Sequence, residues 1–176
     1  MVEATEQPGA AGGPADEGTM KNLKRWLLRL PVPWVFVLVY LMGTALEHWL
    51  RLGVSAVAPR AASLTAGVVL FAAGAVIAGW GLMIFHRIGT TTVPGKCSDR
   101  LVTWGPYRFT RNPMYVGLTL AYLGEAALLR QLWPVPLLVL VLAYLQWTVV
   151  PLEESRLREV FGADYVAYCG RVRRWV

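Results

Sequence analysis

The sequence has few charged residues, cysteines and histidines, and these shortages exclude several classes of protein. Of its 176 residues, 16% are charged and 56% are hydrophobic, whereas a soluble domain carries about 25% charged and somewhat less than half apolar residues. Two cysteines, Cys97 and Cys169, cannot build a disulfide framework. With only two histidines, the chain has no cluster with zinc-site spacing, and we predict no metal centre. No Gly-x-Gly-x-x-Gly element follows a predicted strand, so no Rossmann-type site is expected.

Long apolar segments are what the chain has in abundance. Four of them cover residues 32–50, 63–85, 114–129 and 132–152. A membrane-spanning helix needs roughly 20 apolar residues, with a range of about 17–25. The first, second and fourth segments meet this requirement, and the short third segment forms a tight helical hairpin with the fourth. We therefore predict an all-α integral membrane protein with about four transmembrane helices.

The segments outside the spans differ in character. Residues 1–20 are rich in Gly, Ala and Pro and lack an apolar pattern, which predicts a disordered tail. The stretch "KNLKRWLLRLP" mixes cations with Trp and Leu, which predicts a short helix in the membrane interface. Beyond the fourth span, apolar side chains recur at helical spacing and predict an amphipathic helix along the interface. Residues 21–176 thus form a single membrane domain.

The net charge of +6 indicates a membrane orientation rather than a nucleic-acid partner, because the cations flank the apolar segments. Of the 17 Lys and Arg residues, only Arg51, Arg60 and Arg130 lie in the connections on one side. The excess on the other side predicts that both termini and the 86–113 loop face the cytoplasm. We expect a multi-pass protein of a prokaryotic plasma membrane, with no obligate protein partner.

A concentrated polar cluster, "GPYRFTRNPMY", stands at the entrance of the third span, over residues 105–115. It ends a loop of about 28 residues, and loops of that length are usually functional or disordered. Its aromatic residues argue against disorder. Glu153 and Glu154 follow the fourth span, and acidic groups at membrane depth are functional candidates. The two segments together could hold a zwitterionic, partly aromatic ligand at one membrane surface.

Two stretches, "LVTWGPYRFTRNPMYVG" and "EESRLREVFGADYVAYCGRVRRW", resemble the isoprenylcysteine carboxyl methyltransferase and phospholipid methyltransferase group of membrane enzymes. That group has a Gly-x-Tyr…Arg-His-Pro-x-Tyr element, a Glu-Glu pair, and then Phe-Gly-x-x-Tyr-x-x-Tyr. The resemblance covers roughly residues 90–176. It implies a cofactor core there, with S-adenosyl-L-methionine bound as the methyl donor without a Rossmann domain.

The resemblance also implies which residues contact the cofactor. Aromatic and aliphatic walls would hold its base and sulfonium, and a carboxylate would take its hydroxyl or ammonium groups. The implied residues are Thr92, Asp99, Arg100, Leu101, Val102, Tyr107, Asn112, Pro113, Met114, Tyr115, Glu153 and Glu154.

Two positions depart from the family pattern. Asn112 replaces the usual histidine, and an amide cannot shuttle a proton. Val149 stands where prenylcysteine enzymes place an arginine that grips the substrate carboxylate. Arg108 or Arg111 could supply that cation instead.

We predict methyl transfer to a lipophilic acceptor, in the first place the carboxylate of a fatty acid or prenylcysteine-like lipid. Alternatives are a phospholipid amine, a small thiol, a sterol-type NADPH-dependent membrane reductase, or a non-catalytic scaffold. No general base is assigned.

The candidate catalytic residues are Arg108, Arg111, Tyr122 and Glu125. Glu125 stands out because a carboxylate inside a span is costly unless it is paired or used. Glu47 and His48, late in the first span, are weaker candidates for contact with the substrate.

Overall fold

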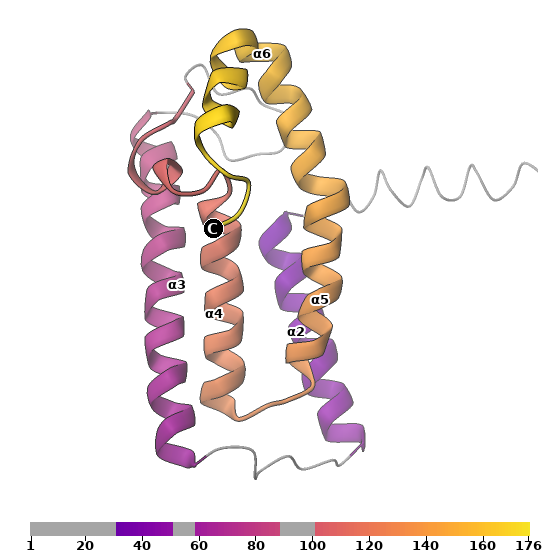
Figure 1. Cartoon of the computed structure of the whole chain (residues 1–176). Helices are drawn as coiled ribbons and strands as arrows, with labels where there is room; N and C mark the ends of the chain where they lie inside the picture. The colour runs from indigo at the N-terminus through magenta and orange to yellow at the C-terminus, as the bar shows by residue number, and fades with distance from the viewer. Residues whose placement is uncertain (1–30, 51–58, 89–100) are drawn as a thin grey trace, which may run out of the picture. The chain divides into compact units, whose positions relative to one another are not determined.

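A computed structural model describes residues 31–50, 59–88 and 101–176 (Figure 1). These residues form helices and connections, without a strand in the described ranges. The helices are α2 (Val32–Leu50), α3 (Arg60–Ile88), α4 (Pro113–Leu129), α5 (Pro134–Tyr144) and α6 (Val150–Arg171), together with the 3₁₀-helix η1 (Gly105–Arg108) and the π-helix η2 (Leu145–Val149). The predicted tail and nearly all of the predicted interfacial helix lie outside the described residues.

Three helical segments are long and apolar enough to cross a membrane: Val32–Leu50, Arg60–Ile84 and Pro134–Arg171. The all-α membrane fold predicted from the sequence is therefore confirmed. The predicted third span is the apolar helix α4, whose 17 residues stand at the lower limit for crossing a bilayer. Large apolar side chains remain exposed on these helices, including Trp34 at 58% and Trp147 at 76%. Exposed apolar rings of this kind suit a lipid environment.

Helices α3 and α4 lie in close contact through small residues. A Cβ atom on Gly74 would lie 2.5 Å from the backbone N of Ala121 and 2.5 Å from the carbonyl O of Gly117. Gly67 makes a similar approach to Leu128. The two backbones can come this near only because side chains are missing at the contact, as is common where helices pack within lipid.

The connection between α4 and α5 is anchored to α2. Tyr40 donates from its hydroxyl to Gln131 Oε1 at 2.8 Å, and Tyr122 donates to the carbonyl O of Pro134 at 2.8 Å. The rings of Tyr40 and Tyr122 meet edge to face with centroids 5.0 Å apart. Glu47 Oε2 accepts from the backbone N of Leu132 at 2.9 Å. Tyr122 and Glu47 thus hold this end of the helices together.

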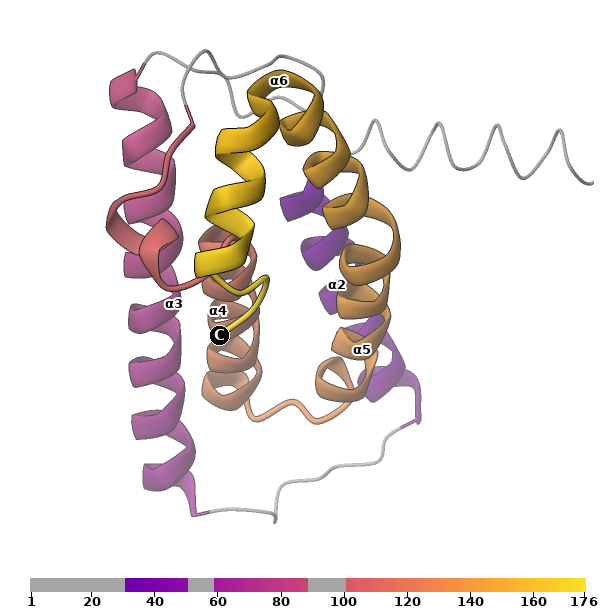
Figure 2. The same cartoon turned by 45° about the horizontal axis from the view of Figure 1, so that its top comes forward.

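Helices α5 and α6 are joined through η2, where the wider π-helical turn shifts the register of the side chains. Within α6, Gly162 has φ 50° and ψ −122°, a conformation that residues with a Cβ rarely adopt. The chain turns there and runs back toward the start of α4 (Figures 1 and 2). The predicted amphipathic helix is therefore present, but its last part is buried against the rest of the domain through Tyr165 and Tyr168.

Candidate functional site

The centre of the candidate site is a hydrogen bond between the first turns of α4 and α6. The Tyr115 hydroxyl donates to Glu153 Oε1 at 2.6 Å. Pro113 occupies the first helical position of α4, where its missing N–H costs nothing and its fixed φ favours a helix start. This start fixes Tyr115 in the first turn, so that its ring reaches the partly buried Glu153.

Tyr107, on η1, belongs to the same site. Its carbonyl O accepts from the Tyr168 hydroxyl at 2.8 Å. A Cβ atom on Gly81 would lie 3.5 Å from the Tyr107 hydroxyl O, so α3 leaves room for the phenol. Burial raises the pKa of Tyr107 well above its ordinary value, and the nearby Tyr168 and Glu153 raise it further. Tyr107 is therefore a neutral phenol at physiological pH.

Beside this pair lies a buried ion cluster on Glu154. Arg174 donates from Nε at 2.9 Å and from Nη2 at 2.7 Å to the two carboxylate oxygens, while Arg111 Nη1 lies 3.0 Å from Oε1. The hydrogen bonds from Arg174 to Glu154 raise the pKa of this guanidinium. Arg111 also donates to Cys169 Sγ at 2.9 Å. Glu154 thus joins the entrance of α4 to the C-terminal residues, and its contact with a cofactor stays a prediction.

The backbone of the C-terminal segment, residues 172–176, is held by the loop before α4. The backbone N of Arg111 donates to Arg173 O at 2.9 Å. Thr110 Oγ1 and Asn112 Nδ2 each donate to Arg174 O at 3.0 Å. The side-chain amide of Asn112 therefore anchors the C-terminal segment, and this hydrogen bond does not depend on pH.

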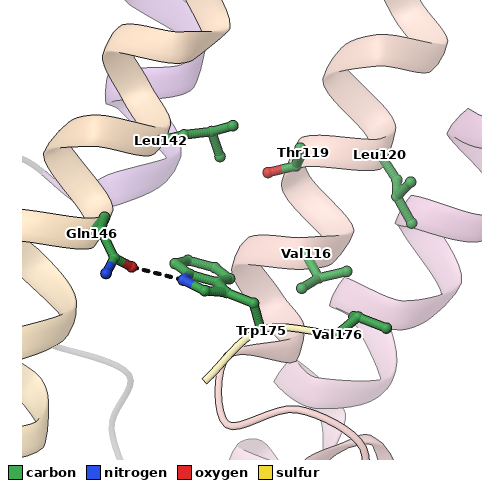
Figure 3. A pocket seen from close by; sticks show the side chains of 7 residues that line it. All are labelled: Val116, Thr119, Leu120, Leu142, Gln146, Trp175 and Val176. Atoms are coloured by element: carbon green, nitrogen blue, oxygen red, sulfur yellow. Dashed lines mark hydrogen bonds between the residues drawn. The ribbon is translucent and has the colours of Figure 1, made fainter. Parts of the chain in front are cut away.

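An apolar pocket of about 550 Å³ opens next to these groups (Figure 3). None of the side chains that line it is charged; the lining residues are Val116, Thr119, Leu120, Leu142, Gln146, Trp175 and Val176. Figure 3 shows the indole of Trp175 between the two helices, with its Nε1 donating to Gln146 Oε1 at 2.7 Å. Val116 directly follows Tyr115, so this part of the pocket lies on the same turn of α4 as the polar pair. We call it the apolar pocket below.

Some of the predicted cofactor residues lie in the described part of the chain, and others lie outside it. Val102 is buried with Ile84 and Tyr107 in a small cluster, and Leu101 is partly buried. Met114 Cγ would contact a Cβ on Gly81 at 3.0 Å. Thr92, Asp99 and Arg100 lie outside the described residues.

The predicted catalytic candidates are not brought to one place. Arg108 is exposed on η1, and Glu125 is exposed on α4. Arg111 is engaged by Glu154, and Tyr122 is buried with its hydroxyl on a backbone carbonyl. None of these four lines the apolar pocket. Among the residues that the structure describes, no group of His, Cys, Asp and Glu could hold a metal ion.

Sequence reasoning missed Gln146 and Trp175, which meet in the pocket across 29 residues. Gln146 carried a usable signal, because a polar amide inside an apolar span needs a partner. For Trp175 there was none, since its position depends on the turn at Gly162.

The model of the family described as Phospholipid methyltransferase matches residues 62–164, which is more than half of the chain. None of the curated proteins and none of the solved structures matches. The matched range contains α4, α5 and η2 and most of α3, with Tyr107, Tyr115 and Glu153. The chain therefore belongs to the phospholipid methyltransferase family of membrane methyltransferases.

Proposed function

We propose that this protein transfers a methyl group from S-adenosyl-L-methionine to a lipophilic acceptor at the cytoplasmic face of the membrane. The observation that carries the proposal is the Tyr115–Glu153 pair, with Tyr107 close by, on the same turn of α4 as Val116 of the apolar pocket. A polar site beside an uncharged cavity suits an enzyme whose two reactants differ in polarity.

The chemistry of the polar site fits the donor. S-adenosyl-L-methionine, when bound, supplies a methyl group on a positively charged sulfonium. A carboxylate at Glu153 can accept hydrogen bonds from ribose hydroxyls or an ammonium group, and the Tyr107 and Tyr115 rings tolerate a cation at their faces. Val102 adds an aliphatic wall beside Tyr107.

The contribution of the chain is chiefly positioning and exclusion of water. Tyr115 fixes the orientation of the Glu153 carboxylate, and the ion cluster on Glu154 fixes the start of α4 relative to α6. Oriented binding of two reactants can account for roughly 7–11 kcal/mol of a reaction barrier. Tyr107, kept neutral by burial, is a hydrogen-bond donor and not a base.

The apolar pocket is the place for the acceptor chain. Leu120 follows Tyr115 on α4, and Leu142 of α5 precedes Glu153 on the continuous segment α5–η2–α6. Both leucines therefore lie deeper in the membrane-spanning part than the polar pair. A lipid with its polar end at the Tyr115–Glu153 pair would therefore extend its chain toward the bilayer interior.

The carboxylate of a fatty acid or prenylcysteine-like lipid is our first candidate acceptor. Val149 is buried in the core, so no cation grips a carboxylate from that position. Of the two arginines that could substitute, Arg111 is paired with Glu154, whereas Arg108 is exposed on η1. A phospholipid amine is the second candidate, which the description of the family favours.

A labelling experiment tests the proposal and separates the acceptors. The purified protein is incubated with methyl-labelled S-adenosyl-L-methionine and total membrane lipid, and the labelled lipids are separated. A product that releases labelled methanol on alkaline hydrolysis is a methyl ester, whereas an alkali-stable label indicates an N-methyl group. Absence of labelled lipid in every fraction, with the donor shown not to bind, would refute the function.

The cytoplasmic orientation rests on the distribution of Lys and Arg along the sequence. Reporters that are active on only one side of the membrane, fused after residue 176, test it. Activity of the periplasmic reporter alone would reverse the orientation.

A further inference from the structure

Trp175 forms a wall of the apolar pocket, and the details of its attachment point to a role in substrate choice. Its indole donates to Gln146 Oε1 at 2.7 Å and packs against the core cluster that contains Leu138, Val141 and Leu145. The ring is therefore fixed both in position and in rotation.

The backbone before Trp175 is fixed as well. The carbonyl O of Arg174 accepts two hydrogen bonds from the loop before α4, and its guanidinium is paired with Glu154. A wall held by its own side chain and by the preceding residue keeps one shape. It can therefore discriminate between ligands by size, which a mobile side chain cannot do as sharply.

The position of Trp175 along the pocket determines which part of an acceptor chain it contacts. Gln146 lies seven residues before Glu153, which corresponds to on the order of 10 Å along a helix. Trp175, bonded to Gln146, therefore meets an acceptor chain several carbons away from the end that reacts. Val116 and Val176 line the pocket beside Trp175, and both have apolar side chains (Figure 3).

We propose that Trp175, locked by Gln146, determines the acceptor specificity of this enzyme by admitting an unbranched hydrocarbon chain and rejecting a chain with a mid-chain methyl branch. The inference rests on the proposed function. In a hydrophobic pocket, one extra carbon changes the preference of a site by roughly 10–200-fold. The indole is the largest side chain of the lining, so removing it creates the space that a branch needs.

Photolabelling tests this without relying on methyl transfer. The full-length protein in lipid nanodiscs is labelled with a palmitic acid analogue that carries a photoactivatable diazirine. Palmitic acid and a mid-chain methyl-branched palmitic acid then compete with the label. The same two chains, attached to lysophosphatidylethanolamine, form a second arm that separates an acid from an amine headgroup.

Four variants complete the design. Trp175→Ala removes the wall, and Trp175→Phe keeps a ring without the N–H donor. Gln146→Met removes the side-chain oxygen that accepts the hydrogen bond from the indole, at similar volume. Trp147→Ala is the matched control, because this neighbouring tryptophan is 76% exposed and lies outside the pocket lining. Each variant is also titrated with S-adenosyl-L-methionine to show that the polar site is intact.

We expect the wild type and Trp147→Ala to prefer the straight chain by about tenfold or more. Trp175→Ala should reduce this preference to below about threefold, with Trp175→Phe and Gln146→Met between the two, and all should retain donor affinity. The proposal is overturned if Trp175→Ala keeps the preference of Trp147→Ala, or if neither chain displaces the label from the wild type. If the straight-chain preference is lost in Trp175→Ala but no protein tested transfers a methyl group, the inference on chain binding is supported. The proposed function is then refuted.

Discussion

The Tyr115 hydroxyl lies 2.6 Å from Glu153 Oε1 and joins two helices whose residues are 38 positions apart in the sequence. A distance of this length is usual for a hydroxyl that donates to a carboxylate, and such bonds are about twice as strong as neutral ones. The bond orients a carboxylate at the point where the fourth apolar segment becomes polar. The polar half of the site depends on this one contact.

Loss of either partner should weaken donor binding. Hydrogen bonds to charged groups contribute about 1.5–3 kcal/mol. We therefore expect Tyr115→Phe and Glu153→Gln each to reduce the affinity for S-adenosyl-L-methionine by about tenfold or more, measured by isothermal titration calorimetry. Because the two residues act as a pair, the double variant should lose less than the sum of the single losses.

Glu159→Gln provides the control for this cycle, since it changes an exposed glutamate on the same helix. Its donor affinity should equal that of the wild type. Wild-type affinity in both Tyr115→Phe and Glu153→Gln would remove these residues from the donor site.

The ion cluster on Glu154 should stabilise the fold more than any exposed pair. Removing one partner of a buried pair leaves charge uncompensated, at about 3–5 kcal/mol for full burial. Arg174 remains 29% exposed, so we expect the lower part of that range for Glu154→Gln. That corresponds to a fall in Tm of roughly 6 °C or more in detergent, with Glu159→Gln again as control.

The pH dependence of the same cluster follows from Arg174. Hydrogen bonding to Glu154 raises the pKa of the Arg174 guanidinium above its ordinary value, so its contribution to stability is complete below the ordinary pKa and is lost only as the pH rises through the raised one. The difference in Tm between wild type and Glu154→Gln should therefore be equal at pH 7 and pH 10. A difference that vanishes by pH 10 would contradict this assignment.

The sequence predicts the helices well because each membrane-spanning segment is apolar along its own length and can be recognised without any distant contact. The first apolar segment coincides with α2, and the third differs from α4 by one residue at its start. The family motif likewise predicts that Tyr107, Tyr115 and Glu153 lie near one another, since it assigns all three to one ligand.

The C-terminal part could not be predicted in the same way. The pairs Glu154–Arg174 and Gln146–Trp175 form only because the chain turns at Gly162. A glycine inside an amphipathic pattern is a weak sign of a turn, since many helices tolerate one. The direction of the turn is set by tertiary contacts, which cannot be predicted from the spacing of apolar residues along the sequence. The family motif accordingly assigns Glu154 to the cofactor, although both of its carboxylate oxygens are bound by arginines in the structure.

Glu47 gives a further test, because its position in a span suggests contact with the substrate. In the structure Glu47 Oε2 accepts from the backbone N of Leu132 at 2.9 Å and of Trp133 at 3.3 Å, at the start of α5. A carboxylate at a helix N-terminus is worth about 0.5–2 kcal/mol as a cap. Glu47→Ala should lower the Tm by a few degrees and leave the affinities for donor and acceptor unchanged. His48→Ala, an exposed neighbour, should change neither, and a loss of acceptor binding in Glu47→Ala would favour the substrate role instead.

The contact between α3 and α4 can be tested with two glycines on the same helix. A Cβ on Gly74 would lie 2.5 Å from backbone atoms of α4, which cannot move aside as a flexible side chain would. We therefore expect Gly74→Ala to separate the helices and to lower the free energy of unfolding by about 1–3 kcal/mol, as overpacking of cores does. A Cβ on Gly79 would have no atom within 4 Å, so Gly79→Ala should be neutral or stabilising by up to about 1 kcal/mol through helix propensity.

Thermal unfolding of Gly74→Ala and Gly79→Ala in one detergent provides the comparison. Because α4 carries Tyr115, a displacement of this helix moves the phenol away from Glu153. Gly74→Ala should therefore also weaken donor binding, whereas Gly79→Ala should bind the donor as the wild type does. Equal stability of the two variants would show that α3 and α4 do not pack through Gly74, and the position of Tyr115 would then need another support.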